Sequence, residues 1–142
     1  MNIQTPTIRP TPFTLPPVIL VVDASGDALD TLCEGISAAG YIAIPARSAC
    51  EAARCLEFAI PDAILLDAAS PEIKGFELGR RIKSMPIWNR VPILFMIEPG
   101  NTKQIVDSYE NGGTDYVSKP LQVPEVIARL FTCTVTHVSA TQ

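Results

Sequence analysis

Short apolar runs alternate along this chain with segments in which apolar residues recur at helical spacing. The run Val18–Val22 contains no polar residue, and such uninterrupted runs are typical of strands covered on both faces, as in a parallel sheet. Strands are expected at residues 18–22, 41–44, 63–66, 92–97 and 115–118. Since a helical segment separates each strand from the next, the pattern predicts right-handed crossovers with helices on both faces of one sheet.

Local signals mark the ends of the expected helices. Ser48 and Glu51 form a capping box before one helical segment, and Gly40 follows another as a C-cap. The helices are expected at residues 27–39, 48–58, 76–85, 102–111 and 124 to about 133. Residues 132–138 are rich in β-branched side chains, which leaves open whether they fray or become extended. These β/α units predict an α/β, flavodoxin-like three-layer sandwich with a five-stranded parallel sheet of order 2-1-3-4-5.

The uneven placement of prolines separates an N-terminal segment from the rest of the chain, because five of the thirteen precede residue 18. Residues 1–17 are therefore predicted to be a flexible Pro/Thr-rich arm, residues 18–135 the folded domain and residues 136–142 a C-terminal tail. A net charge of −4 and a pI of about 4.9 argue against a nucleic-acid-binding face and a polybasic membrane anchor. No apolar run approaches the ~20 residues that span a bilayer. The four cysteines lack CxxC spacing and no signal peptide is visible, which favours reduced thiols and a cytoplasmic location.

Charged residues close three of the expected strands: Asp23 the first, Asp67 the third and Lys119 the fifth. Because ligand sites of open α/β sheets lie beyond the carboxyl ends of the strands, these side chains are expected to converge. Two neighbouring carboxylates repel unless a cation stands between them, so the cluster indicates a divalent metal. With an ammonium group to balance an incoming anion, the cluster predicts phosphoryl transfer to a carboxylate. Taken singly, each residue has an ordinary alternative as a turn, cap or solvated loop residue.

Four segments carry a resemblance to a known family. They are Ile19-Leu-Val-Val-Asp23, the segment 64–76 with its Asp-x-x-x-Pro-x-x-x-Gly spacing, Val91-Pro-Ile-Leu-Phe95, and Gly113-Thr-Asp-Tyr-Val-Ser-Lys-Pro120. In this order they resemble the receiver (CheY-like) domain of bacterial two-component response regulators. The resemblance runs from about Pro17 to about Phe131.

The resemblance implies roles for individual residues. Asp67 falls at the phosphoacceptor position, which takes a phosphoryl group from a histidine kinase or a phosphotransfer protein. Asp23 and the backbone carbonyl of Ala69 fall, with Asp67, at positions that bind Mg²⁺. Lys119 falls where the family contacts the phosphoryl group, and Tyr116 at an aromatic switch position. Such a domain catalyses at most its own phosphorylation and dephosphorylation. It signals to a downstream protein or domain through its fourth helix, fifth strand and fifth helix, a face that is also a candidate for homodimer formation.

Three positions depart from the family's pattern. Ala24 stands where the family has a second acid that binds the metal directly, so Mg²⁺ binding is expected to be weak. Ile97 replaces Thr or Ser, which removes a hydroxyl that would bond the phosphoryl group and couple it to Tyr116. The carboxylate of Glu98 either adds charge to the metal site or repels an incoming phosphate. Losing one pre-placed donor costs about 10²–10³ in rate in other enzymes, so slow or absent phosphorylation is expected.

Other readings stay open beside a working receiver. Ala24 and Ile97 favour a degenerate pseudo-receiver, a protein-interaction module that works without phosphorylation. A small α/β enzyme or FMN binder is disfavoured, because no G-x-G-x-x-G or Walker sequence occurs and the single His137 forms no hydrolase arrangement. Two arrangements stay open for the chain: it is either a stand-alone receiver or one piece of a larger regulator. Arg80-Arg81-x-Lys83 is expected to be a solvated helix face, and Trp88 to cover an edge of the sheet.

Overall fold

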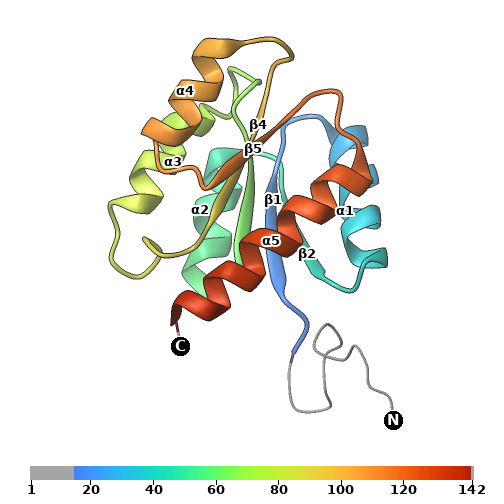
Figure 1. Cartoon of the computed structure of the whole chain (residues 1–142), viewed down its shortest axis with the longest axis vertical. Coiled ribbons are helices and arrows are strands. Elements are labelled where there is room, and N and C mark those ends of the chain that lie inside the picture. The colour runs from blue at the N-terminus through green and yellow to red at the C-terminus, as the bar shows by residue number, and fades with distance from the viewer. Residues whose placement is uncertain (1–14, 142) are drawn as a thin grey trace.

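A computed structural model describes residues 15–141, with side-chain surroundings through Val135. Five parallel strands form one sheet in the order β2-β1-β3-β4-β5 (Figure 1). The strands are β1 Val18–Val22, β2 Ile42–Ala46, β3 Ala63–Asp67, β4 Ile93–Ile97 and β5 Asp115–Ser118. The helices are α1 Gly26–Ala38, α2 Ala49–Phe58, α3 Gly75–Lys83, α4 Thr102–Glu110 and α5 Val123–Thr141. The predicted flavodoxin-like α/β fold and its strand order are therefore confirmed.

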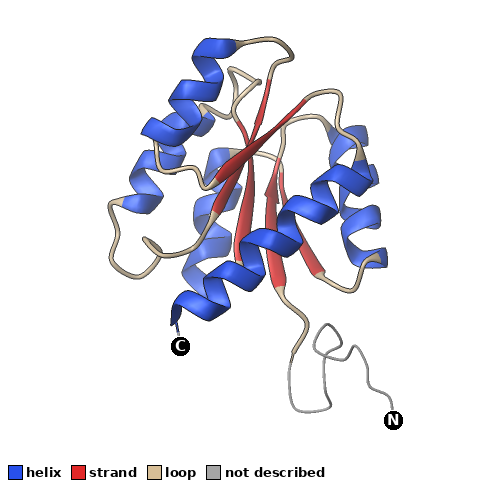
Figure 2. Ribbon diagram, in the orientation of Figure 1, coloured by secondary structure: helices blue, strands red, loops and turns tan. Residues whose placement is uncertain are grey.

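Helices cover both faces of the sheet and give the fold three layers (Figure 2). Along β1, Ile19 and Val21 belong to the core shared with α1 and α5, whereas Leu20 and Val22 belong to the core shared with α2 and α3. None of these four side chains is more than 1% exposed. The strand carries no polar residue because neither of its faces meets water.

The last helix is longer than expected. α5 continues to Thr141, so the prediction of a helix that ends near Cys133 was wrong. Thr134 is only 5% exposed, and its hydroxyl donates to the backbone carbonyl of Leu130 one turn earlier. This bond satisfies the hydroxyl inside the helix, and the burial of Cys133 and Thr134 outweighs the weak helical propensity of β-branched residues.

β2 is an edge strand that pairs with β1. It extends to Ala46 rather than ending at Ile44, and it includes Pro45. Proline donates no backbone hydrogen bond, so it is tolerated in a strand with one free edge. The end of β2 also supports the neighbouring strand, because the carbonyl of Ala46 accepts the backbone N–H of Asp23.

The parallel strands all point their carboxyl ends to one edge of the sheet, the upper edge in Figure 1. The expected arm lies mostly outside the described residues, and the limits of arm, domain and tail stay predictions. Within residues 15–141, no helix is both long enough and apolar enough to cross a membrane.

Candidate functional site

The turn after β1 fixes the first acid of the site. Asp23 directly follows the strand and is 1% exposed. Its Oδ1 accepts the backbone N–H of Ser25 at 2.9 Å, a local turn that strand-end aspartates commonly form. Its Oδ2 is buried and accepts no hydrogen bond from the described residues. One oxygen of this carboxylate is thus anchored by the backbone, and the other has no hydrogen-bond donor among these residues.

Asp67, the last residue of β3, is fully buried and is held in the same way. Its Oδ1 accepts the backbone N–H groups of Ala69 at 2.9 Å and Ser70 at 3.2 Å. Its Oδ2 accepts no hydrogen bond among the residues that the structure describes. A Cβ on Gly75 would collide with the backbone carbonyl of Asp67, so the Asp-x-x-x-Pro-x-x-x-Gly spacing has a steric reason.

Lys119 follows β5 and joins the two acids. Its Nζ lies 3.2 Å from Asp67 Oδ1 and 3.3 Å from Asp23 Oδ2. The backbone N–H of Lys119 donates to the carbonyl of Ile97, which ties the end of β5 to β4, and the Lys119–Pro120 peptide bond is cis. The predicted convergence of Asp23, Asp67 and Lys119 at the carboxyl edge of the sheet is confirmed.

The electrostatics of this pocket are governed by burial. Removal from water raises the pKa of Asp67, and the neighbouring Asp23 carboxylate raises it further. The Lys119 ammonium and the N–H of Ala69 oppose this rise in the pKa of Asp67. Neither Asp23 Oδ2 nor Asp67 Oδ2 accepts a hydrogen bond among the described residues, and only Asp23 Oδ2 lies in an ion pair with Lys119. A buried acceptor without a partner, such as Asp67 Oδ2, is costly unless a ligand contacts it. The arrangement is suited to a carboxylate nucleophile or to a cation ligand.

Comparison with known families identifies the class of domain. Residues 19–131 match the family model of the response regulator receiver domain. The chain belongs to this family. The resemblance carried by the strand-end residues is confirmed, and the domain is a signalling domain of two-component systems.

Similar proteins include larger regulators. The receiver is 31% identical over 112 residues to the phosphate regulon transcriptional regulatory protein PhoB of Pseudomonas aeruginosa, covering 79% of this chain and 49% of that protein. It is 33% identical over 114 residues to a probable cyclic di-GMP phosphodiesterase of Vibrio cholerae, covering 80% of this chain and 26% of that protein. A putative response regulator from Chloroflexus aurantiacus is 28% identical, with a TM-score of 0.80 over 84% of this chain and 98% of that chain. The chain thus spans about half or less of the length of these two curated relatives.

Receiver domains generally bind Mg²⁺ in their acidic pocket, and the donors present here can be tested against that ion. The carboxylate oxygens Asp67 Oδ2, without a partner among the described residues, and Asp23 Oδ2, which Lys119 contacts, are hard ligands of the kind that Mg²⁺ prefers. Ala24 packs against the core and supplies no carboxylate. Within residues 15–141, no group of three His, Cys, Asp or Glu side chains could hold a metal ion. Since Mg²⁺ usually relies on one or two carboxylates plus phosphate and water, the residues fit the ion with a reduced ligand set.

Glu98 is not part of that ligand set. Its Oε1 accepts the side-chain amides of Asn101 at 3.3 Å and Gln104 at 3.2 Å, and its backbone N–H donates to Gln104 Oε1 at 2.8 Å. Asn101 also caps α4 by accepting the backbone N–H of Gln104. These hydrogen bonds among Glu98, Asn101 and Gln104 were not predicted from the sequence, although an Asn-x-x-Gln spacing at a helix start is a capping signal.

Ile97 and Tyr116 belong to one apolar cluster. Ile97 is fully buried, and Tyr116 packs half-buried against the same cluster. The Tyr116 ring meets Tyr109 of α4 edge-on, with centroids 6.2 Å apart and an interplanar angle of 87°. Residue 97 therefore offers no hydroxyl to link the pocket to Tyr116. Apolar packing between Ile97 and Tyr116 is the contact that remains to couple them. Tyr109 was missed by the sequence analysis, and its signal is a single aromatic residue on a polar helix.

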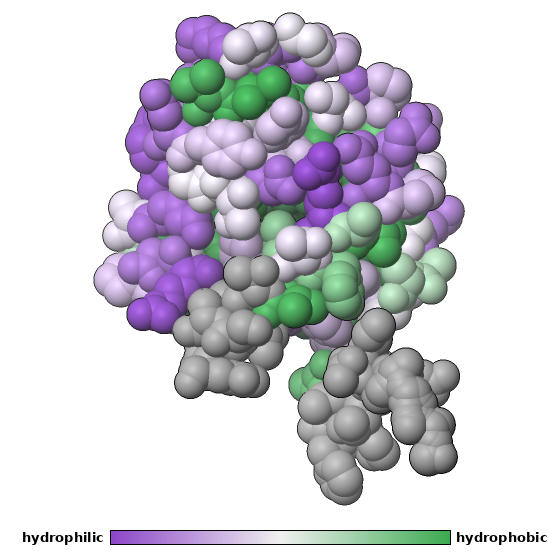
Figure 3. Space-filling model, in the orientation of Figure 1, coloured by the Kyte–Doolittle hydropathy of each residue, from purple (hydrophilic) through white to green (hydrophobic). Residues whose placement is uncertain are grey.

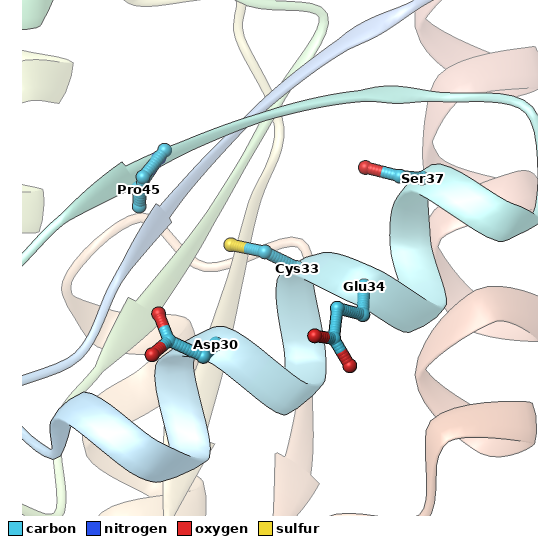
Figure 4. A pocket seen from close by; sticks show the side chains of 5 residues that line it. All are labelled: Asp30, Cys33, Glu34, Ser37 and Pro45. Atoms are coloured by element: carbon cyan, nitrogen blue, oxygen red, sulfur yellow. The ribbon is translucent and has the colours of Figure 1, made fainter.

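A separate hollow lies between α1 and β2 and has a volume of about 500 Å³ (Figure 4). Asp30, Cys33, Glu34, Ser37 and Pro45 line it, and none of them belongs to the acidic pocket. Burial raises the pKa of the Cys33 thiol, and Asp30 adds to that rise. A thiol with a raised pKa is a poor nucleophile and a poor metal ligand near neutral pH. The Cys33 thiol of this hollow is therefore not a reactive group near neutral pH.

Proposed function

We propose that this receiver accepts a phosphoryl group on Asp67 from a histidine kinase or a phosphotransfer protein. The observation that supports this best is the free, buried Oδ2 of Asp67, whose partner oxygen is anchored by two backbone N–H groups and Lys119. Oδ2 attacks the phosphorus of phosphohistidine, the P–N bond breaks, and its electron pair stays on the imidazole, which takes a proton from solvent. The Lys119 ammonium balances the charge of the acyl phosphate that forms.

In this proposal, Asp23, Asp67 and the backbone carbonyl of Ala69 would hold Mg²⁺. The ion would neutralise negative charge on the phosphoryl oxygens. Because Ala24 offers no carboxylate, we expect weak binding of the ion. The missing hydroxyl at Ile97 is expected to cost a further factor of about 10²–10³ in rate. Phosphorylation and dephosphorylation of Asp67 would be the only reactions that the domain assists.

We propose α4, β5 and α5 as the output face toward a downstream protein or domain, and as the face of a homodimer. Tyr109 and Val106 of α4 are 52% and 48% exposed, and an apolar patch lies over α4 at the upper left of Figure 3. Arg129 of α5 pairs with Asp115 of β5 at 2.8 Å, and Tyr109 of α4 meets Tyr116 of β5 edge-on, so a shift of β5 would reach both α4 and α5. The output is a protein contact in the cytoplasm, without direct contact to nucleic acid.

The second candidate function is a pseudo-receiver that binds partners without phosphorylation. Three observations favour it: Lys119 already contacts both buried carboxylates, no third acid joins them within residues 15–141, and Ile97 is part of the core. A pocket whose negative charge is partly balanced from within has less need of a metal ion to remain stable.

Intact-protein mass spectrometry after incubation with acetyl phosphate and Mg²⁺ distinguishes the two functions. A working receiver gains the mass of one phosphoryl group, and Asp67→Asn abolishes this gain. The matched control Asp27→Asn removes an exposed acid near the pocket and keeps the gain. Ala24→Asp serves as a positive control with a restored acid. If Ala24→Asp gains mass and the natural chain does not, with acetyl phosphate and with a cognate kinase, the pseudo-receiver is the correct function.

A further inference from the structure

The edge of the sheet opposite the acidic pocket exposes large apolar side chains. Phe58 and Ile60, at the end of α2 and after it, are 83% and 54% exposed. Met85 and Ile87, in the loop after α3, are 45% and 57% exposed. The two loops lead into β3 and β4, which are paired neighbours in the sheet. These four side chains therefore lie along one edge, at the amino-terminal ends of adjacent strands.

The same edge carries basic side chains that form no ion pair with its acids, Glu57 and Asp62, within the described residues. Residues 78–97 contain four Arg and Lys residues and no Asp or Glu, in a chain with a net charge of −4. Arg80 donates to Asn111, and Lys83 donates to the carbonyls of Asn89 and Val91. Arg81 and Arg90 are exposed and form no ion pair within the described part of the chain. The α2–α3 rim is defined here as Phe58, Ile60, Met85, Ile87, Arg81 and Arg90.

The two free arginines differ from two other arginines of the surface, although Arg54 of α2 is also exposed without an ion pair within the described residues. Arg47 pairs with Asp30, and Arg129 pairs with Asp115, so these guanidinium groups already have carboxylates. Basic residues also stabilise a helix C-terminus, which is sufficient reason for Arg81 near the end of α3. Arg90 lies beyond the helix, in the loop before β4, where that reason does not apply. In Figure 3, strongly hydrophilic residues lie at the lower left, where Figure 1 places this loop.

We propose that the α2–α3 rim docks a segment of a partner protein that presents apolar side chains flanked by Asp or Glu. The apolar residues supply area to bury, and the free arginines supply charge complementarity. A nucleic acid or an anionic membrane fits less well, because the chain as a whole is acidic and repels extended polyanions. Glu57 borders the rim at its α2 end, so the carboxylates of the partner are expected over the α3 end.

The position of the rim has a functional consequence. It lies at the opposite edge of the sheet from Asp67, and none of its residues belongs to α4, β5 or α5. A partner on the rim leaves the acidic pocket and the proposed output face uncovered. Docking there is therefore independent of phosphorylation, and it can hold a receiver beside a second protein while the pocket reacts.

Three synthetic amphipathic helical peptides of equal length test the proposal with the full chain. The first has Leu and Phe on one face and Glu on the others, the second replaces Glu by Lys, and the third replaces Leu and Phe by Ala. Fluorescence anisotropy of labelled peptides measures binding, and Trp88, the single tryptophan, reports contact near the rim. The first peptide alone is expected to bind, and more weakly as salt is added. The double variant Arg81→Glu/Arg90→Glu is expected to weaken binding about tenfold or more.

Matched variants separate charge and apolar contact from loss of folding. Arg81→Lys/Arg90→Lys keeps most of the affinity, Ile87→Ser weakens it, and Val106→Ser on α4 leaves it unchanged, with circular dichroism confirming the fold of each. Equal binding of the Lys peptide, or an equal loss in Val106→Ser, overturns the proposal. A dimer in sedimentation that Ile87→Ser abolishes assigns the rim to a second copy instead. A tenfold gain in affinity after removal of residues 1–14 assigns it to the chain's own arm.

Discussion

Replacement of Lys119 by Met keeps the length of the side chain and removes its charge. It leaves Asp67 and Asp23, 0% and 1% exposed, without the cation that contacts them at 3.2 and 3.3 Å. Removing one partner of a buried ion pair costs about 3–5 kcal/mol. Because the Lys119 side chain is 28% exposed and its charge is partly screened by water, we expect the low end of this range, about 3 kcal/mol, in the free energy of unfolding near neutral pH.

The destabilisation in Lys119→Met is expected to depend on pH. The pKa of Asp67 is raised in the folded chain from its ordinary value of 3.8, so the folded state binds more protons than the unfolded state between those two pKa values. Stability therefore falls as pH rises through this window, and the full penalty is present above it. Lys119 lowers the pKa of Asp67, so its loss raises that pKa and extends the window upward. The difference between variant and natural chain should shrink as pH falls toward 4.

Urea denaturation between pH 4 and 8, followed by circular dichroism, measures this effect. Adding Asp67→Asn to Lys119→Met removes one of the two uncompensated charges and should recover part of the lost stability. The matched control Lys103→Met removes an exposed lysine paired with Asp107 and should leave the midpoint unchanged. If Lys119→Met is as stable as the natural chain at neutral pH, or loses the same stability at every pH, the electrostatic argument is refuted.

Three further substitutions test the same pocket. Ala24→Asp supplies the missing carboxylate and should tighten Mg²⁺ binding about tenfold or more, measured by titration calorimetry; unchanged affinity would contradict the reduced ligand set. Gly75→Ala forces a Cβ against the Asp67 carbonyl and should cost about 2 kcal/mol in thermal unfolding, with slower phosphorylation; a neutral effect would show that α3 gives way. Ile97→Thr should cost about 2 kcal/mol for a buried hydroxyl in an apolar site and should speed acyl-phosphate formation; an unchanged rate would mean that another step is limiting.

The site was more predictable than its surroundings because the geometry of a parallel sheet determines where the strand-end residues lie. In a parallel sheet every strand ends at the same edge, so Asp23, Asp67 and Lys119 meet although they are distant in sequence. The apolar runs fix which segments are strands, since both faces of each central strand are buried. No side-chain detail is needed for that inference, and it was confirmed.

Features that depend on side-chain packing were not predictable from the pattern. Spacing leaves Glu98 free to face the pocket, and the hydrogen bonds to Gln104 that turn it toward α4 become visible only once the loop is folded. The edge-on contact of Tyr109 and Tyr116 joins a helix and a strand whose relative position no local rule supplies. The extension of α5 past Cys133 has the same origin, because burial of Thr134 overrides local propensity.

Charge balance in the pocket links the two candidate functions. With both carboxylates and the Lys119 ammonium ionised, the pocket carries one net negative charge, which Lys119 alone keeps small. An acyl phosphate on Asp67 adds about one further negative charge, so the phosphorylated pocket needs a divalent cation more than the free pocket does. By linkage, Mg²⁺ would then bind the proposed phosphorylated chain more tightly than the free chain. In the proposed function, a free pocket that is stable without metal and a phosphorylated pocket that depends on it would be two states of one site, with the phosphoryl donor and Mg²⁺ together favouring the second.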